Sequence, residues 1–191
     1  MDKRRSLTHV AMLVLCALFL YSCSGGEKEE ATESAQPQEE PEQIISYLNQ
    51  DVSFGVFFDE KGTRRTLDLD RDQKEFDVYI IINFPEDIEI AAAEWRLELP
   101  EGISVINDKY ILNRTISMGL MDYGLSERFP CVSGPSCLLH TLTLRTDREL
   151  KNAEIAVLPS TEGEFLGVAE CTEGYPQIRA TSFRGVVNPG E

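Results

Sequence analysis

The stretch IAAAEWRLEL, residues 90–99, alternates between two kinds of side chain along its length. Every second position is apolar: Ala91, Ala93, Trp95, Leu97 and Leu99. The positions between them hold Ala92, Glu94, Arg96 and Glu98. A period of two places successive side chains on opposite faces of a β-strand. The stretch is therefore predicted to be a half-buried strand with one face in a core and the other in water.

The same period recurs along most of the chain after the N-terminal region. It is clearest in two runs, formed by Val52, Phe54, Val56 and Phe58 and by Phe76, Val78, Ile80 and Ile82. Shorter strands are expected at residues 64–69, 103–106, 115–123, 138–145, 153–158, 165–171 and 178–187. Short strands separated by Gly, Pro, Asn and Asp are typical of antiparallel sandwiches and barrels. The sequence thus predicts an all-β domain.

Two stretches carry a resemblance to a known family. FPEDIEIAAAEWRLELPEGISVIN (residues 84–107) resembles the early strands of cohesin-type and related carbohydrate-binding-like β-sandwiches, and LLHTLTLRTD (residues 138–147) is similar to a later strand. The resemblance covers about residues 72–160 and implies a two-sheet antiparallel β-sandwich, cohesin-like, Ig-like or jelly-roll in type. Cohesins bind dockerin modules and their structural relatives bind polysaccharide. No residue here matches a recognition position of either, so the resemblance speaks for fold and not for activity.

The N-terminus has the pattern of an export signal. Lys3, Arg4 and Arg5 precede the apolar run VAMLVLCALFLY (residues 10–21), which is too short to span a bilayer. The next residues, Leu20-Tyr21-Ser22-Cys23, resemble the lipobox of bacterial lipoproteins. That resemblance implies cleavage before Cys23, a diacylglycerol thioether on its sulfur and an acylated amino group. The alternative is an ordinary secretory signal with an incidental cysteine.

This N-terminal interpretation divides the chain into three parts. Residues 1–22 form the signal peptide, residues 23–43 the lipidated cysteine and a disordered acidic linker, and residues 44–191 the β-sandwich domain. The linker carries seven glutamates against Lys28, too polar and too charged to fold. The expected location is the bacterial cell envelope with a lipid anchor. The outer membrane is favoured because Ser24, and not aspartate, follows Cys23.

Charge narrows the classes of partner. The chain has a formal net charge of −15, and residues 44–191, with 14 basic and 25 acidic side chains, have −11. Such a surface repels phosphate backbones, so nucleic-acid binding is not expected. A protein or polysaccharide ligand remains compatible with this charge.

Three aspartates have a spacing that suggests calcium. Asp68, Asp70 and Asp72 alternate as in the opening of an EF-hand loop. However, Gln73 stands where the loop needs glycine and Tyr79 where it needs a bidentate glutamate. A charged loop between strands is the favoured interpretation, and an irregular calcium site is the alternative.

His140 is the one histidine left after signal removal. It is in phase with Leu138, Leu142 and Leu144, which predicts a position on the buried face with backbone partners for its ring nitrogens. A serine triad lacks the G-x-S-x-G elbow, and a zinc set of Cys131, Cys137, His140 and Cys171 would have unfamiliar spacing. The sequence therefore predicts neither a catalytic residue nor a cofactor.

The folded part has three cysteines, so one thiol must stay unpaired if a disulfide forms. Cys131–Cys171 is the preferred pair, which would leave Cys137 as a small buried residue. A bridge from Cys137 to Cys171 and a local Cys131–Cys137 bridge remain alternatives.

Three functions fit these features. The first is a membrane-anchored, non-catalytic module for binding or adhesion to protein or glycan, with Tyr110, Tyr123 and Tyr175 as candidate glycan contacts. The second is a structural accessory subunit of the envelope. The third is a hydrolase that uses dispersed carboxylates, which sequence spacing alone does not test. The first is preferred.

Overall fold

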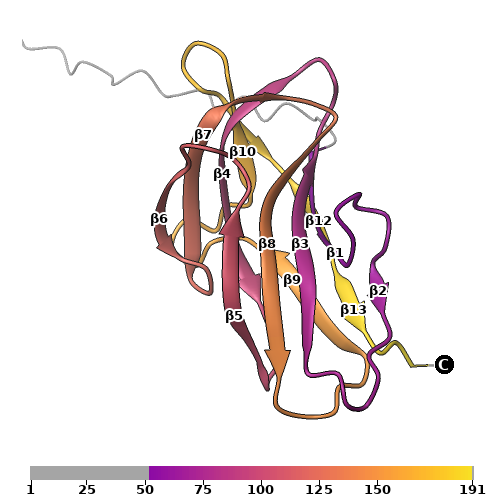
Figure 1. Ribbon diagram of the computed structural model, residues 1–191. Coiled ribbons are helices and arrows are strands. Elements are labelled where there is room, and N and C mark those ends of the chain that lie inside the picture. Colours follow the sequence, from indigo (N-terminus) through magenta and orange to yellow (C-terminus); the bar gives the residue numbers. More distant parts are fainter. Residues whose placement is uncertain (1–51, 191) are drawn as a thin grey trace, which may run out of the picture. The chain divides into compact units, whose positions relative to one another are not determined.

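The computed structural model describes residues 52–190, and every regular element in that range is a β-strand (Figure 1). The strands are β1 (Ser53–Phe57), β2 (Thr66–Leu67), β3 (Glu75–Asn83), β4 (Glu89–Glu98), β5 (Ile103–Tyr110), β6 (Ile116–Leu120), β7 (Gly124–Ser133), β8 (Ser136–Thr146), β9 (Ala153–Leu158), β10 (Gly167–Glu170), β11 (Gln177–Arg179), β12 (Thr181–Phe183) and β13 (Gly185–Val187). The all-β prediction is confirmed. The described residues hold no helix, and so none that is long and apolar enough to cross a membrane.

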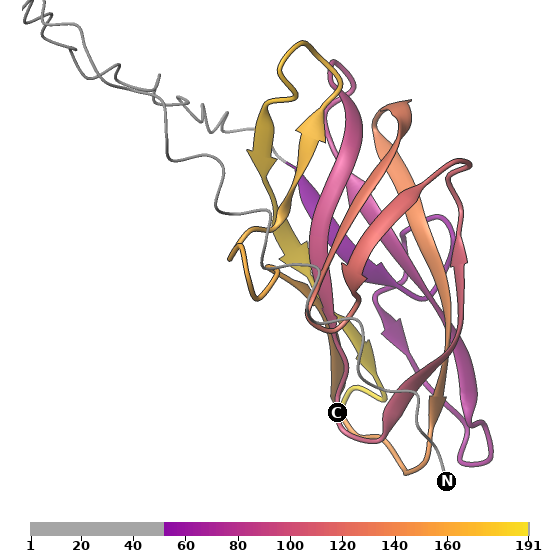
Figure 2. The ribbon, with the colours of Figure 1, turned by 90° about the vertical axis from the view of Figure 1, so that its left-hand side faces the viewer.

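The strands form two sheets that pack face to face (Figures 1 and 2). The first sheet has the order β12-β1-β3-β8-β5. The second is centred on β4, which pairs with β7, with β10 and, at its C-terminal end, with β9. It continues from β7 to β6, from β10 to β11, and from β9 through β13 to β2. Most pairs are antiparallel; β1–β12 and β2–β13 are parallel.

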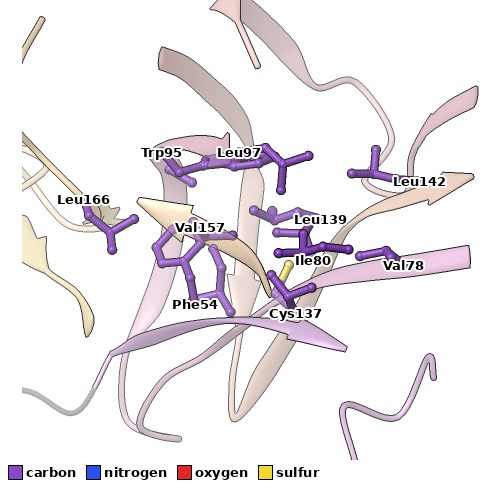
Figure 3. Close-up of a cluster of buried hydrophobic side chains, with 14 of the residues drawn as sticks. Phe54, Val78, Ile80, Trp95, Leu97, Cys137, Leu139, Leu142, Val157 and Leu166 are labelled. Carbon is purple, nitrogen blue, oxygen red and sulfur yellow. The ribbon is translucent and has the colours of Figure 1, made fainter. Parts of the chain in front are cut away.

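The core lies between the sheets and is built from the alternating positions of the long strands. Phe54 of β1, Ile80 of β3 and Trp95 of β4 are fully buried there (Figure 3). Ala93 and Leu97 join Trp95 on the inner face of β4, as the alternation in the sequence predicted. Glu94 and Arg96 point outward and are half-buried on the opposite face.

A β-bulge shifts the phase of β8. Ile80 of β3 pairs with His140 and Ile81 with Leu138, so Leu139 is an extra residue on β8. Both Leu139 and His140 consequently enter the core, while Leu138 is only half-buried. The expectation that Leu138 shares the buried face of His140 was wrong, because strict alternation does not survive a bulge.

Two regions differ from the strands expected from sequence. The strand expected at residues 115–123 is shorter, because β6 ends at Leu120 and a turn follows it. The next strand, β7, was not expected from the sequence. Residues 178–187 are not one strand, because β11 belongs to the second sheet, β12 to the first and β13 again to the second. The C-terminal segment thus crosses twice between the sheets. Gly185 allows the start of β13 to lie close to Val56 of β1, because a Cβ at this position would be only 2.7 Å from Val56 Cγ1.

Candidate binding site

The outer face of the second sheet carries a row of exposed apolar side chains on β6. Ile116, Met118 and Leu120 are 66%, 70% and 64% exposed. Their spacing of two places all three on the same side of the strand, which turns away from the core. An apolar row of this kind in water costs free energy unless something covers it.

Beside this row lies a groove made of two adjoining depressions. The first has a volume of about 410 Å³ and extends from Ile116 and Met118 to Phe165 and β10. The second has a volume of about 420 Å³ and extends from Met118 and Leu120 to Tyr123 and Ser160. Glu94, Met118 and Ser126 line both depressions. We call these two depressions together the groove.

The groove owes its depth to small residues on its floor. Ala92 of β4, Gly167 and Ala169 of β10 line the first depression, and Gly119 and Gly124 line the second. Gly167 has no room for a larger side chain, because a Cβ would lie 2.2 Å from the carbonyl oxygen of Ile178. The floor therefore remains low between the higher walls of β6 and Phe165.

Charged groups differ at the two ends of the groove. At the first depression the Arg128 guanidinium lies 5.4 Å from the centre of the Tyr175 ring, and Arg179 lies 5.7 Å from the Phe165 ring. At the second, Glu162 lines the wall, and Glu94, which lines both depressions, accepts a hydrogen bond from the Ser160 hydroxyl. The groove thus combines apolar walls with a cationic end and an anionic end.

A buried polar network lies beneath the groove. His140 of β8 is fully buried, and its Nδ1 lies 2.7 Å from Asp108 Oδ1 and its Nε2 2.9 Å from Glu127 Oε1. The Trp95 indole N–H donates to Glu127 Oε2 at 3.0 Å. Tyr110 packs against the imidazole with the ring centres 4.5 Å apart. His140 lies in the core, as expected, but two carboxylates and not backbone groups are its partners.

The network holds a positive charge inside the sandwich. Burial by itself lowers the pKa of His140, but hydrogen bonds and attraction to Asp108 and Glu127 outweigh it and raise the pKa to about 9. At neutral pH the imidazolium therefore bridges two carboxylates. Asp108 and His140 belong to the first sheet, Glu127 and Trp95 to the second, so the network ties the sheets together. Glu127 also fixes β7, which lies under the groove.

The cysteines separate into a bonded pair and a free thiol. Cys131 of β7 and Cys171, just after β10, form a disulfide with a Cα–Cα distance of 5.8 Å. Cys137 is free and buried at the start of β8, and burial together with the charge of Glu127 raises its pKa to about 11. The four-residue zinc set is therefore not assembled, since two of its sulfurs are bonded to each other and His140 is held by carboxylates.

The calcium candidates do not converge. Asp68, Asp70 and Asp72 are exposed in the loop between β2 and β3. Within residues 52–190 they form no cluster of ligand atoms that could hold an ion. The backbone carbonyl of Asp70 accepts a hydrogen bond from the Gln73 amide, which makes this segment a turn.

The three candidate tyrosines lie in different places. Tyr123 is 63% exposed and lines the second depression, whereas Tyr175 stacks on Arg128 beside the first. Tyr110 lies on β5 of the first sheet and contacts His140. Tyr123 and Tyr175 therefore flank the groove, and Tyr110 is away from it. Cys23 and the linker lie outside the described residues.

Sequence reasoning missed both β7 and Glu127. Leu125, Glu127 and Phe129 alternate inward on β7, but a glutamate among inward positions and Pro130 just after them hide the pattern. The spacing of Leu125 and Phe129 could have indicated the strand, because residues four apart lie on the same face of a β-strand. The groove residues of β6 were within an expected strand, but nothing in the sequence indicated which face they occupy.

No family model and no curated protein sequence matches this chain. Among solved structures it is similar to a type III cohesin module from the cellulosomal cell-surface anchoring scaffoldin ScaE of Ruminococcus flavefaciens, with TM-score 0.52, 8% identity, and coverage of 78% of this chain and 93% of that one. It is also similar to the third ScaB cohesin of R. flavefaciens in complex with a group 1 dockerin, with TM-score 0.50, 14% identity, and coverage of 75% and 97%.

A third similar structure comes from a type I cohesin–dockerin complex of Clostridium thermocellum, with TM-score 0.50, 10% identity, and coverage of 73% of this chain and 99% of that one. At such low sequence identity, the similarity to these structures is evidence for the fold alone. Together with the two sheets and their strand order, it shows that residues 52–190 have the cohesin-like β-sandwich fold.

Proposed function

We propose that this chain is a membrane-anchored, non-catalytic lipoprotein whose β-sandwich binds a protein partner through the groove. One observation carries the proposal: three neighbouring side chains of β6, Ile116, Met118 and Leu120, are about two-thirds exposed along an apolar groove. Contiguous exposed apolar surface on a soluble domain marks interaction sites.

The groove has the composition of a protein interface. Arg128 stacked on Tyr175 offers two of the three residue types, arginine, tyrosine and tryptophan, that are enriched among residues with large contributions to binding. Met118 separates two depressions that are each large enough for a side chain. A polysaccharide would need many polar partners for its hydroxyl groups, and the apolar walls supply few. Two of the similar structures are cohesins in complex with dockerins, which supports a protein as the partner.

The groove offers little for catalysis. Its lining within the described residues includes neither histidine nor cysteine. Of its three carboxylates, Glu94 is hydrogen-bonded to Ser160 and Glu127 to His140 and Trp95, which leaves Glu162 on the wall of the second depression. His140, the residue most suited to proton transfer, has both ring nitrogens engaged inside the core. Binding is therefore the activity that these side chains favour.

Anchoring rests on the lipobox-like Leu20-Tyr21-Ser22-Cys23. Two or three acyl chains contribute about 0.8 kcal/mol per buried CH₂ and together make a durable anchor. Cys23→Ala is expected to release the protein into the soluble fraction and to abolish metabolic labelling with fatty acid. Membrane retention with unchanged labelling would refute the anchor without affecting the groove.

The partner can be sought with a photo-crosslinking residue in the full-length protein in its own membrane. Met118→benzoylphenylalanine is expected to give a discrete protein adduct. The control, Ile106→benzoylphenylalanine, replaces an exposed apolar residue of β5 that lies outside the groove, and it should give none. Met118→Glu should abolish recovery of that same partner, whereas Ile106→Glu should not. Equal adducts at both positions, or a polysaccharide adduct at 118, would contradict the proposal.

A further inference from the structure

β6 is the outermost strand on one side of the second sheet (Figures 1 and 2). Among residues 52–190 it pairs only with β7, over an unbroken register from Ile116 with Arg128 to Leu120 with Gly124. An antiparallel strand turns half of its N–H and C=O groups away from its neighbour. β6 therefore presents a row of backbone donors and acceptors on its free edge.

β6 lacks the features that protect the other edges of this sandwich. Natural edge strands avoid unwanted pairing by being very short, by carrying charge or by containing a bulge. β5 carries Asp108 and Lys109 and has a register shift after Val105. β2, β11 and β12 have two or three residues each; Arg65 precedes β2, Arg179 is the last residue of β11 and Arg184 follows β12. β6, with the sequence ISMGL, has five residues, no charge, no proline and an unbroken register with β7. Gly119 has a φ of 102°, so the regular extended edge runs over Ile116, Ser117 and Met118.

We infer that the free edge of β6 accepts an extended segment of a partner protein, which adds to the second sheet as a strand beside β6. Main-chain hydrogen bonds would hold such a segment, and its alternate side chains would contact Ile116, Met118 and Leu120. This inference goes beyond the groove, because it concerns the backbone edge of β6 and not the surface above β7. A partner could use the edge alone.

Charge identifies the chemistry of that segment. Asp122 follows β6 in the turn and Glu162 lines the wall next to Leu120. At the other end of β6, Arg114 precedes the strand and Arg128 lies opposite Ile116. Residues 44–191 carry a net charge of −11, which opposes close approach of a second copy and attracts cations. The acidic linker of residues 24–43 is excluded for the same reason. Because the net charge of the domain outweighs the two arginines at the Ile116 end, the occupant is a basic segment of another protein in which apolar and cationic residues alternate, with its cationic side chains nearest Asp122 and Glu162.

The test uses detergent-solubilised full-length protein and three fluorescent decapeptides. (Lys-Val)₅ has the expected chemistry, (Glu-Val)₅ reverses its charge, and (Lys-Val)₅ methylated on every backbone nitrogen keeps the side chains but cannot donate. We expect (Lys-Val)₅ to bind at least tenfold more tightly than either control. Hydrogen–deuterium exchange should slow at least tenfold at amides within Ile116–Leu120 when it binds.

Proline substitution tests the edge from the protein side. N–H groups alternate along a strand, so of Ser117 and Met118 one faces β7 and the other faces the free edge. Of Ser117→Pro and Met118→Pro, the variant that keeps the wild-type melting temperature is expected to lose (Lys-Val)₅ binding at least tenfold. Ser117→Ala is the matched control for Ser117→Pro and should retain binding. Met118→Ala should lose less binding than Met118→Pro, because only proline removes the backbone donor.

Three results would overturn the inference. One is the absence of slowed exchange in β6 at millimolar (Lys-Val)₅. Another is equal binding of the methylated peptide, which would indicate side-chain binding in the groove. The third is a dimer by light scattering with β6 amides protected in the absence of peptide, which would make a second copy the occupant. Failure of the Met118 crosslink alone would refute the groove and leave the edge intact.

Discussion

His140 Nε2 lies 2.9 Å from Glu127 Oε1 and joins the two sheets of the sandwich through a buried ion pair. The side chains are 0% and 1% exposed, so neither charge is solvated by water. Such a pair is strongly destabilising to break but not necessarily stabilising compared with apolar packing. Here it also orders Trp95, which donates to the other oxygen of Glu127.

Stability should fall with rising pH because of His140. Its pKa rises from 6.5 to about 9 on folding, so the folded state holds this proton more tightly than the unfolded chain. The contribution is complete below about pH 6.5 and is lost as the pH rises through about 9. It amounts to about 3 kcal/mol. Urea unfolding at pH 6, 7.5 and 9 would measure it. A free energy of unfolding that stays constant or rises would contradict the assignment.

His140→Leu should destabilise the domain by about 3–5 kcal/mol, because Glu127 and Asp108 would then be close without a cation between them. Adding Glu127→Gln should recover about half of the loss, since the amide oxygen still accepts from Trp95. The double variant should also lack the pH dependence. Additive losses in a double-mutant cycle would show that the two residues are not coupled.

Removing the disulfide should cost roughly 4 kcal/mol by the chain-entropy relation, since Cys131 and Cys171 are 40 residues apart. The experiment is denaturant unfolding of Cys131→Ala/Cys171→Ala against the parent protein. Cys137→Ala serves as the control and should cost much less, because it removes only a small buried side chain. A larger loss for the control than for the double variant would contradict the expectation.

The Cys137 thiol should be unreactive in the folded protein. Its pKa of about 11 leaves little thiolate at pH 8, and the side chain is buried. Mass spectrometry of the peptide that contains residue 137 should show alkylation only after unfolding in denaturant. Rapid modification under native conditions would show that β8 opens at its start.

Calcium should not stabilise the domain. Asp68, Asp70 and Asp72 are exposed and their carboxylates do not gather, so millimolar Ca²⁺ should shift the melting temperature by less than about one degree. Asp70→Asn should behave like the parent protein. A concentration-dependent rise that Asp70→Asn abolishes would establish an irregular calcium site.

Local pattern was enough to predict the class of fold. The alternation around Trp95 indicated a strand with a buried face, and Trp95, Ala93 and Leu97 do lie in the core. The cohesin-like resemblance of the same stretch agrees with the solved structures. These features depend on residues that are close together in the sequence, so the alternation of apolar side chains and the composition are enough to predict them.

Packing between segments that are far apart in the sequence determined the partners of His140, the bulge in β8 and the position of β7. His140 is 32 residues from Asp108 and 13 from Glu127, so no local pattern could pair them. The bulge at Leu139 changed which side chains face inward on β8, and Glu127 concealed β7 because a charged residue at an inward position breaks alternation.

The groove, likewise, exists only where β6, β7, β4 and β10 meet. The sequence of β6 specifies that it is apolar, but Ile116, Met118 and Leu120 are exposed because no other segment of the described chain packs over their face of the sheet. Burial is a property of the whole set of contacts, whereas alternation is a property of one strand.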